Sequence, residues 1–234
     1  MSHRTAEEAL EQYQLAMGSE LGTAFHRLVG ETYHLTSIWD QYETLFKNKE
    51  RVDLLNGSGG YFFRNVQDIF FERVLLGLCR LTDPAEQRGR RNLSLSTLVP
   101  LVSEDLRAEL IQAIAEAKQA SGFCRDWRNR LIAHNDFERA LKTGKPLKAA
   151  TGLGVVAALK AVHSVLRLLG LKYLDTHMVF SGIDDAGVHL LHQLYWGRER
   201  MNDRKKRLAE RIYLDEDFST PSWLDRENTL SRYD

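Results

Sequence analysis

The sequence predicts an all-α fold, a bundle of about five helices, and two observations support this prediction. Apolar residues recur at spacings of three and four over long stretches, which is the period of one face of a helix. The prolines lie between these stretches rather than within them. This placement is expected because proline cannot continue the interior of a helix.

Three amphipathic stretches are expected to place one face each in a common core. They lie at residues 21–46, 106–131 and 155–173. Their apolar faces consist of Leu21, Phe25, Leu28, Thr32, Leu35, Trp39, Tyr42 and Phe46; of Leu106, Leu110, Ala113, Ala117, Ala120, Cys124, Trp127 and Leu131; and of Val155, Leu159, Val162, Leu166, Leu169 and Tyr173.

Residues 62–81 have a different pattern. Their apolar side chains are distributed around most of the helix, which predicts a central, buried element. The glycine-rich segment 56–60 is expected to separate this helix from the first one, and Thr82-Asp83-Pro84 to end it. Ser103 is expected to be the N-cap of the next helix. A last helix is expected at about residues 186–211.

Length and composition indicate an ordinary folded protein. The 234 residues are 43% apolar and 27% charged, which excludes a disordered chain. Basic and acidic side chains number 32 each, which excludes a uniformly basic nucleic-acid binder. We expect one helical domain at residues 1–214 and an acidic tail at 215–234.

The protein is expected to be cytoplasmic, with no part in a membrane. The chain has no uncharged apolar run of about 18 residues, and its N-terminus lacks the apolar segment of a signal peptide. Cys79 and Cys124 do not resemble a disulfide framework. We therefore expect two reduced thiols.

Three patterns that suggest a cofactor or a metal lack the necessary context. The glycines of residues 152–157 match a dinucleotide-binding fingerprint only by letters, because no strand is expected before them. Glu31 and His34 have the spacing of a di-iron helix but lack a second copy. His189 and His192 lack further ligands. We expect neither a cofactor nor a metal.

The most unusual segment is residues 123–136, which closes the second apolar stripe. His134 continues the line of Trp127 and Leu131, where an apolar residue is due. At about 100° per residue, Arg128 lies roughly 60° to one side of this face and His134 roughly 60° to the other. A histidine transfers protons near neutral pH, and an arginine fork matches phosphate oxygens. Together they are the minimum set for cleaving RNA without a metal.

A structural explanation of the same residues stays open. Basic side chains near the C-terminus of a helix are favoured by its dipole. Under this explanation, Arg128 or Arg130 pairs with a nearby carboxylate. The candidates are Asp126 and Asp136. His134 is then a residue at the boundary of the core whose hydrogen-bonding groups have partners within the protein.

The residues Arg128-Asn129, followed by four residues and His134, resemble the signature of the HEPN superfamily (higher eukaryotes and prokaryotes nucleotide-binding). The wider context resembles its abortive-infection U-type (AbiU-like) branch. Arg80-Leu-Thr-Asp83-Pro and residues 127–136 carry this second resemblance. It covers roughly residues 21–173.

The resemblance implies a helical bundle that dimerises, with two motifs facing each other across a shared cleft. It also implies a metal-independent endoribonuclease of phage-defence or toxin type that leaves 2′,3′-cyclic phosphate ends. His134 is then the general acid or base, Arg128 the phosphate binder and Asn129 a positioning residue. The implied partners are an RNA substrate, a second copy of the chain, and an antitoxin or sensor protein.

Arg130, Arg80 and Asp83 are weaker candidates for substrate binding. For Arg80 and Asp83, a capping or pairing role at the end of the buried helix is the preferred explanation. Basic clusters at residues 88–91 and 198–211 are candidates for contacts with an RNA backbone. Such clusters are more often a solvated helix face or loop.

Two alternatives to a nuclease remain. A non-catalytic HEPN-like module would bind a nucleotide, RNA or a protein partner without turnover. A helical interaction protein would use the motif only for its structure. Substitution of His134 distinguishes these cases, because only the nuclease loses an activity.

Overall fold

The computed structural model describes residues 5–132, 141, 143, 145–180 and 185–214. The predicted all-α class is confirmed. The described part of the chain contains the α-helices α1 (Ala6–Met17), α2 (Ser19–Phe46), α3 (Lys49–Thr82), α4 (Glu104–Ala120), α5 (Gly122–Trp127), α7 (Gly152–Leu174) and α8 (Ala186–Ala209). It also contains a 3₁₀ helix η1 (Leu95–Leu101), a π-helical turn η2 (Arg128–Ile132), and the strands β1 (Glu86–Gln87) and β2 (Arg90–Arg91).

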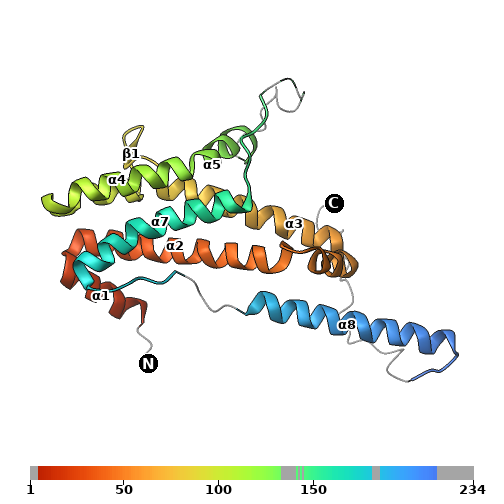
Figure 1. The fold of residues 1–234 in the computed structure, drawn as a ribbon. Helices are drawn as coiled ribbons and strands as arrows, with labels where there is room; N and C mark the ends of the chain where they lie inside the picture. The colour runs from red at the N-terminus through yellow and green to blue at the C-terminus, as the bar shows by residue number, and fades with distance from the viewer. Residues whose placement is uncertain (1–4, 133–140, 142, 144, 181–184, 215–234) are drawn as a thin grey trace, which may run out of the picture.

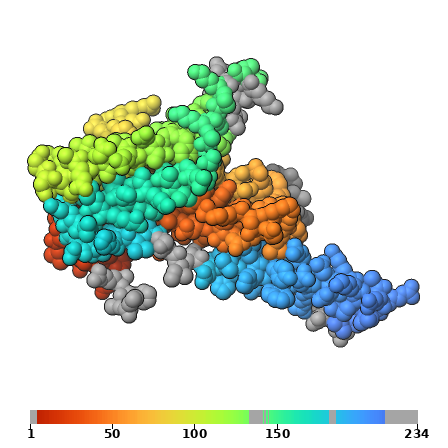
Figure 2. Space-filling model, viewed as in Figure 1, coloured from red at the N-terminus to blue at the C-terminus, as the bar shows by residue number. Residues whose placement is uncertain are grey.

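The long helices α2 and α3 form an antiparallel pair, and the other helices pack around it (Figure 1). The helices α4 and α7 lie across one part of the α2–α3 pair. Helix α1 folds back along the start of α2. Helix α8 packs against the other end of α2 and α3 and then extends away from the body (Figures 1 and 2).

The main hydrophobic core is built from the three predicted stripes. Leu28 of α2, Leu110 of α4 and Leu166 of α7 are each at most 1% exposed, and they belong to one contiguous cluster. The second stripe shifts slightly, because Ile114 is buried where Ala113 was expected. The predicted N-cap Ser103 does precede α4. Burial of these faces supplies the main favourable term in folding.

The expectation of an all-round buried central helix is wrong for residues 62–69 of α3. Phe62 and Ile69 are 63% and 62% exposed, whereas Val74, Leu75 and Leu78 are fully buried. The physical reason is the length of the helix: in α3 only the segment from Phe71 to Leu81 packs in the main core. The N-terminal half belongs to a second, smaller cluster of Leu45, Leu54, Leu55, Phe63 and Leu191, through which α8 attaches.

Two further expectations about helix boundaries are corrected. The break between α2 and α3 lies at Lys47 and Asn48, and the glycine-rich segment only interrupts α3 at Gly59, whose backbone is non-helical. Helix α1 was not predicted. Its signal was present as a capping box, in which Thr5 and Glu8 each accept a hydrogen bond from the other's backbone nitrogen.

Helix α7 is the one described helix that is long and apolar enough to cross a membrane, judged by length and composition. It contacts α4, α2, α1 and α3. Val155, Val162 and Leu169 on its inward face are fully buried in the main core. In this fold α7 therefore serves as a core helix.

The close approach of α1 to α2 depends on Gly22. A Cβ atom at this position would lie 2.5 Å from the carbonyl oxygen of Tyr13 and 2.6 Å from the nitrogen of Gln14. Both atoms belong to the backbone of α1, so the helix has to move away. We expect Gly22→Ala to lower the free energy of unfolding by about 1–3 kcal/mol, measured by urea denaturation.

The matched control lies on the same helix. Gly30 has nothing within 4 Å of the added Cβ. Gly30→Ala is expected to raise the free energy of unfolding by up to about 1 kcal/mol, through helix propensity alone. Equal effects of the two substitutions would contradict the proposed helix contact.

Candidate anion-binding site around Arg128

The predicted motif lies where the helix after α4 changes its winding. Helix α5 ends at Trp127, and η2 continues as a π-helical turn from Arg128 to Ile132. A π-turn contains more residues than an α-turn, and such turns are frequent at functional sites. The angles expected for Arg128 from regular α-helical geometry therefore do not apply beyond Trp127.

Arg128 is fixed by the carboxylate of Asp83. Its Nη1 donates to both oxygens of Asp83, at 3.2 and 3.0 Å, and both side chains are largely buried. Asp83 is the C-cap residue of α3. Of the two predicted partners, Asp126 pairs with Arg130 instead, and Asp136 lies outside the described residues. A charge-assisted contact of this kind restricts the orientation of the guanidinium.

A second arginine strengthens the same junction. The Nε atom of Arg125 lies 3.6 Å from Asp83, and its Nη2 donates to the carbonyl and hydroxyl oxygens of Thr82, at 2.6 and 2.8 Å. The Thr82 hydroxyl in turn lies 3.0 Å from that of Ser121 at the start of α5. The end of α3 is therefore joined to α5 by buried polar contacts. These contacts keep Asp83 and Arg128 at a fixed position relative to each other.

Arg128 lines a polar cavity of about 600 Å³. The other lining residues come from the β-hairpin formed by β1 and β2, which follows α3. The hairpin turns at Arg88 and Gly89, whose φ angles are +53° and +73°, as a type I′ turn requires. This turn places Arg88 and Arg90 at the cavity, with Gln87 and Asn92 beside them. The strands were not predicted from the sequence.

The cavity has the chemistry of an anion site. Of the five described residues that line it, three are arginines and none is acidic. Within the described residues, the side chains of Arg88 and Arg90 make no ion pair, whereas the neighbouring Arg91 contacts Glu20 at 3.4 Å. Unpaired guanidinium groups beside a fixed one suit a phosphate, whose oxygens accept several charged donors.

The other predicted site residues are placed as follows. Asn129 is exposed and accepts a hydrogen bond from Nε of Arg128 at 3.1 Å. Arg130 is not among the described residues that line the cavity. It pairs with Asp126 at 3.5 Å and donates to the carbonyl of Lys145. The alternative of an Arg130–Asp126 pair is thus confirmed, and substrate binding by Arg130 stays a prediction.

Arg80 does not line this cavity. It lies 3.7 Å from Glu31, a carboxylate that also accepts a hydrogen bond from Arg73 at 3.0 Å. Asp83, in contrast, is in direct contact with Arg128. His134 lies outside the described residues, as does Asp136, so the role of this histidine stays a prediction from the sequence.

The two cysteines lie close to this junction. Cys79 and Cys124 are both free and fully buried, as expected. Burial raises the pKa of Cys79 to about 11 and that of Cys124 to about 12. At neutral pH both are uncharged thiols, and thiolate is the reactive form. They act here as apolar core residues.

The sequence patterns that lacked context are placed as follows in the described part of the chain. Glu31 pairs with Arg73 and Arg80. The glycines of residues 152–157 begin α7 behind the N-cap Thr151. No group of three or more possible metal ligands occurs within the described residues.

The comparison with protein families decides the identity. The family AbiU2 of HEPN proteins matches residues 18–186, almost three quarters of the chain. The chain belongs to the HEPN AbiU2 family. The predicted resemblance is thereby confirmed, and the protein is an HEPN module of an abortive-infection family. No curated protein and no solved structure shows a significant match.

Within this AbiU2 protein, the hairpin arginines are the site residues that the sequence did not identify as part of the motif. The sequence shows the basic cluster at residues 88–91 but not that it lies at the same cavity as Arg128. Gly89 is the signal for the turn in the sequence, because a type I′ turn needs positive φ, which glycine adopts without strain. The convergence with Arg128 required the tertiary structure.

Proposed function

We propose that this AbiU2 protein is a metal-independent endoribonuclease that leaves 2′,3′-cyclic phosphate ends. The observation that supports the proposal most is the fixed guanidinium of Arg128, which lies beside Arg88 and Arg90 in a cavity whose described lining holds no carboxylate. This arrangement offers several charged donors to one phosphodiester. Family membership and the signature that ends in His134 add independent support.

The reaction requires one proton transfer on each side of the phosphorus. The ribose 2′-oxygen attacks phosphorus and loses its proton to a base, the bond from phosphorus to the 5′-oxygen breaks, and that oxygen receives a proton. The products are a 2′,3′-cyclic phosphate and a 5′-hydroxyl. We assign proton transfer to His134 and stabilisation of the charged phosphoryl oxygens to Arg128, with Asn129 orienting its guanidinium.

The functional assembly and location are part of the proposal. A homodimer would bring two motifs together, and large exposed apolar side chains on α3 and α8 supply surface for such contacts, among them Phe62, Ile69 and Trp196. Two free thiols fit a reducing, cytoplasmic location. An antitoxin or sensor protein would restrain the activity.

The direct test is an RNA cleavage assay with the purified full chain in excess EDTA. Structured and single-stranded RNAs are incubated with the protein, and the product ends are identified by mass spectrometry. Cleavage that persists in EDTA and leaves cyclic phosphate ends is the expected result. Cleavage that EDTA abolishes, or products with 3′-hydroxyl ends, would overturn the proposal. RNA binding without cleavage would identify a binding module instead.

Arg128 is expected to be sensitive even to a conservative change. Arg128→Lys keeps a positive charge next to Asp83. It loses the planar fork of donors that matches the oxygens of a phosphate. We expect the cleavage rate to fall by about 10²-fold, the usual cost of one lost donor to a developing charge. The initial rate on a labelled RNA measures this.

Arg107→Lys is the matched control, since Arg107 pairs with Glu104 on α4, away from the cavity. It should cleave RNA at the wild-type rate. A lysine at position 128 that supports wild-type cleavage would show that the guanidinium fork of Arg128 is not required.

A further inference from the structure

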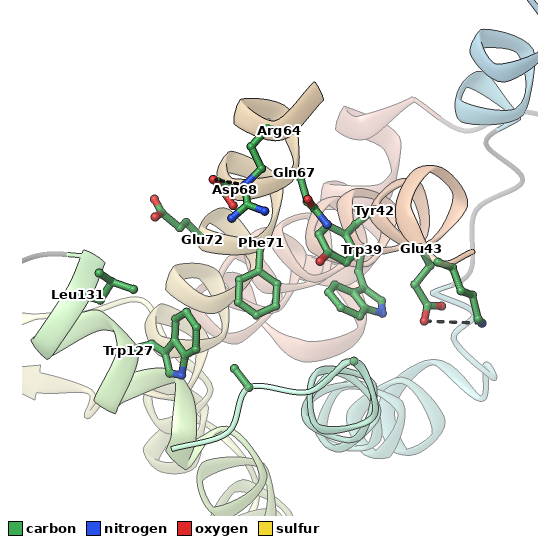
Figure 3. Close-up of a pocket in the computed structure, with 13 residues that line it drawn as sticks. Trp39, Tyr42, Glu43, Arg64, Gln67, Asp68, Phe71, Glu72, Trp127 and Leu131 are labelled. Carbon is green, nitrogen blue, oxygen red and sulfur yellow. Dashed lines mark hydrogen bonds and ion pairs between the residues drawn. The ribbon is translucent and has the colours of Figure 1, made fainter. Parts of the chain in front are cut away.

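A second cavity lies on the same helical segment as the motif. Its volume is about 620 Å³, within the range of pockets that hold small ligands. It opens between α2, α3, the α5–η2 segment and the start of α7 (Figure 3). Its walls include the four aromatic residues Trp39, Tyr42, Phe71 and Trp127.

The aromatic rings form a continuous, well-supported wall. Trp39 and Tyr42 are stacked with centroids 4.8 Å apart, and Phe71 lies 5.8 Å from Tyr42 and 5.5 Å from Trp127. Figure 3 shows Phe71 between Trp127 on one side and the Trp39–Tyr42 pair on the other. Trp127 is fixed through its Nε1, which donates to the carbonyl of Lys148 at 2.7 Å. Such rings are a surface on which a planar base can stack.

Polar side chains of α3 line the edge of this wall. Arg64 is occupied by Asp68, with Nε 3.2 Å from a carboxylate oxygen. Within the described residues, Gln67 and Glu72 make no side-chain hydrogen bond or ion pair. Figure 3 places Glu72 on the side of Trp127 and Leu131, next to the motif segment. A half-buried carboxylate is thus available to accept hydrogen bonds from a ligand.

The two cavities are lined by consecutive residues. Trp127 and Leu131 line the aromatic cavity, and Arg128 between them lines the anion site. A nucleotide likewise consists of a planar base, which suits the aromatic cavity, and an anionic phosphate, which suits the anion site. Neighbouring residues of one helical segment therefore present the two kinds of contact that a strand of RNA needs.

We propose that the aromatic cavity binds a guanine base of the RNA substrate, next to the phosphate held at Arg128. The base stacks on Trp127 and meets Phe71 at its edge, because the two rings are inclined by 76° to each other. The carboxylate of Glu72 accepts hydrogen bonds from the guanine N1–H and N2–H. Guanine is the standard base that presents two adjacent N–H donors on its Watson–Crick edge, which a carboxylate matches with both oxygens. This inference rests on the proposed function, because RNA is taken to be the substrate.

The test is isothermal titration calorimetry of the full chain with guanosine 5′-monophosphate, and in parallel with the cytidine and uridine monophosphates. We expect saturable binding that is about tenfold or more tighter for the guanosine nucleotide. Glu72→Gln, which keeps the size of the side chain, should remove this preference. Glu109→Gln, at an exposed position of α4, should retain it.

The readout is binding, so the outcome is independent of cleavage. Guanosine preference that depends on Glu72 supports the inference even if the protein cleaves no RNA. Equal affinity for all three nucleotides, no saturable binding at millimolar concentration, or a preference unchanged in Glu72→Gln would overturn it. Binding of choline in place of any nucleotide would also overturn it, because aromatic rings with carboxylates equally suit an organic cation.

Discussion

Replacing His134 with alanine is expected to lower the rate of RNA cleavage by roughly 10²- to 10⁴-fold, the range that one general acid or base contributes. The imidazole is the one group of the signature whose ordinary pKa allows it to take and return a proton near neutral pH. Arg128 keeps its contact with Asp83 in this variant and still binds the phosphate. The initial rate on a labelled RNA in EDTA measures the loss.

His177→Ala is the control for this change, because His177 is an exposed histidine after α7. It should cleave RNA at the wild-type rate. RNA affinity, measured with a non-cleavable 2′-deoxy analogue, should change little in His134→Ala. Wild-type cleavage by His134→Ala would exclude the assigned mechanism, and a lowered unfolding temperature as its only effect would favour a structural role of the motif.

The second large effect is a loss of stability below neutral pH that originates at His163. This residue of α7 is 8% exposed, shares a 2.9 Å hydrogen bond with the hydroxyl of Thr36, and stacks on Phe180 with centroids 4.5 Å apart. Burial, and to a smaller extent the charge of Arg167, lowers the pKa of His163 from 6.5 to about 4. The folded protein therefore holds this imidazole uncharged.

The sign of the effect follows from the two pKa values. Below pH 6.5 the unfolded chain binds a proton at His163, whereas the folded protein binds it only near pH 4. The unfolded state is thus favoured progressively as the pH falls from 6.5 to 4. The stability that depends on an uncharged His163 is fully present above pH 6.5. Between pH 7 and pH 5 the free energy of unfolding is expected to fall by about 2 kcal/mol through this one group.

Urea denaturation at pH 7 and pH 5 measures this loss. His163→Gln keeps a polar side chain next to Thr36 but cannot titrate, so the difference between the two pH values should shrink by about 2 kcal/mol relative to wild type. His177→Gln removes an exposed histidine and should leave the difference unchanged. An identical pH dependence in wild type and His163→Gln would refute the assignment.

The sequence predicted the main core well because its signal is periodic and local. Leu28, Leu110 and Leu166 lie in stripes at helical spacing, and burial of such stripes determines how each helix faces its neighbours. Where the prediction was wrong, the cause was tertiary. Phe62 and Ile69 are as apolar as Val74, but the part of α3 before Phe71 extends past the main core.

The candidate site divides in the same way. Residue types and spacing predicted Arg128 and His134, because cleavage of RNA needs a proton carrier near a phosphate-binding group, and the resemblance to the HEPN signature added Asn129. Spacing did not show that Asp83, 45 residues earlier in the chain, holds Arg128. It also did not place the hairpin arginines at the same cavity.

The sequence by itself thus determined the all-α class, the inward faces of the helices and the signature that assigns the protein to its family. Only the tertiary structure decided which carboxylate pairs with Arg128, which arginines line the same cavity, and which aromatic rings form a cavity beside the motif. The physical reason is that helical periodicity is a property of neighbouring residues. Ion pairs and cavities, in contrast, depend on how distant helices pack.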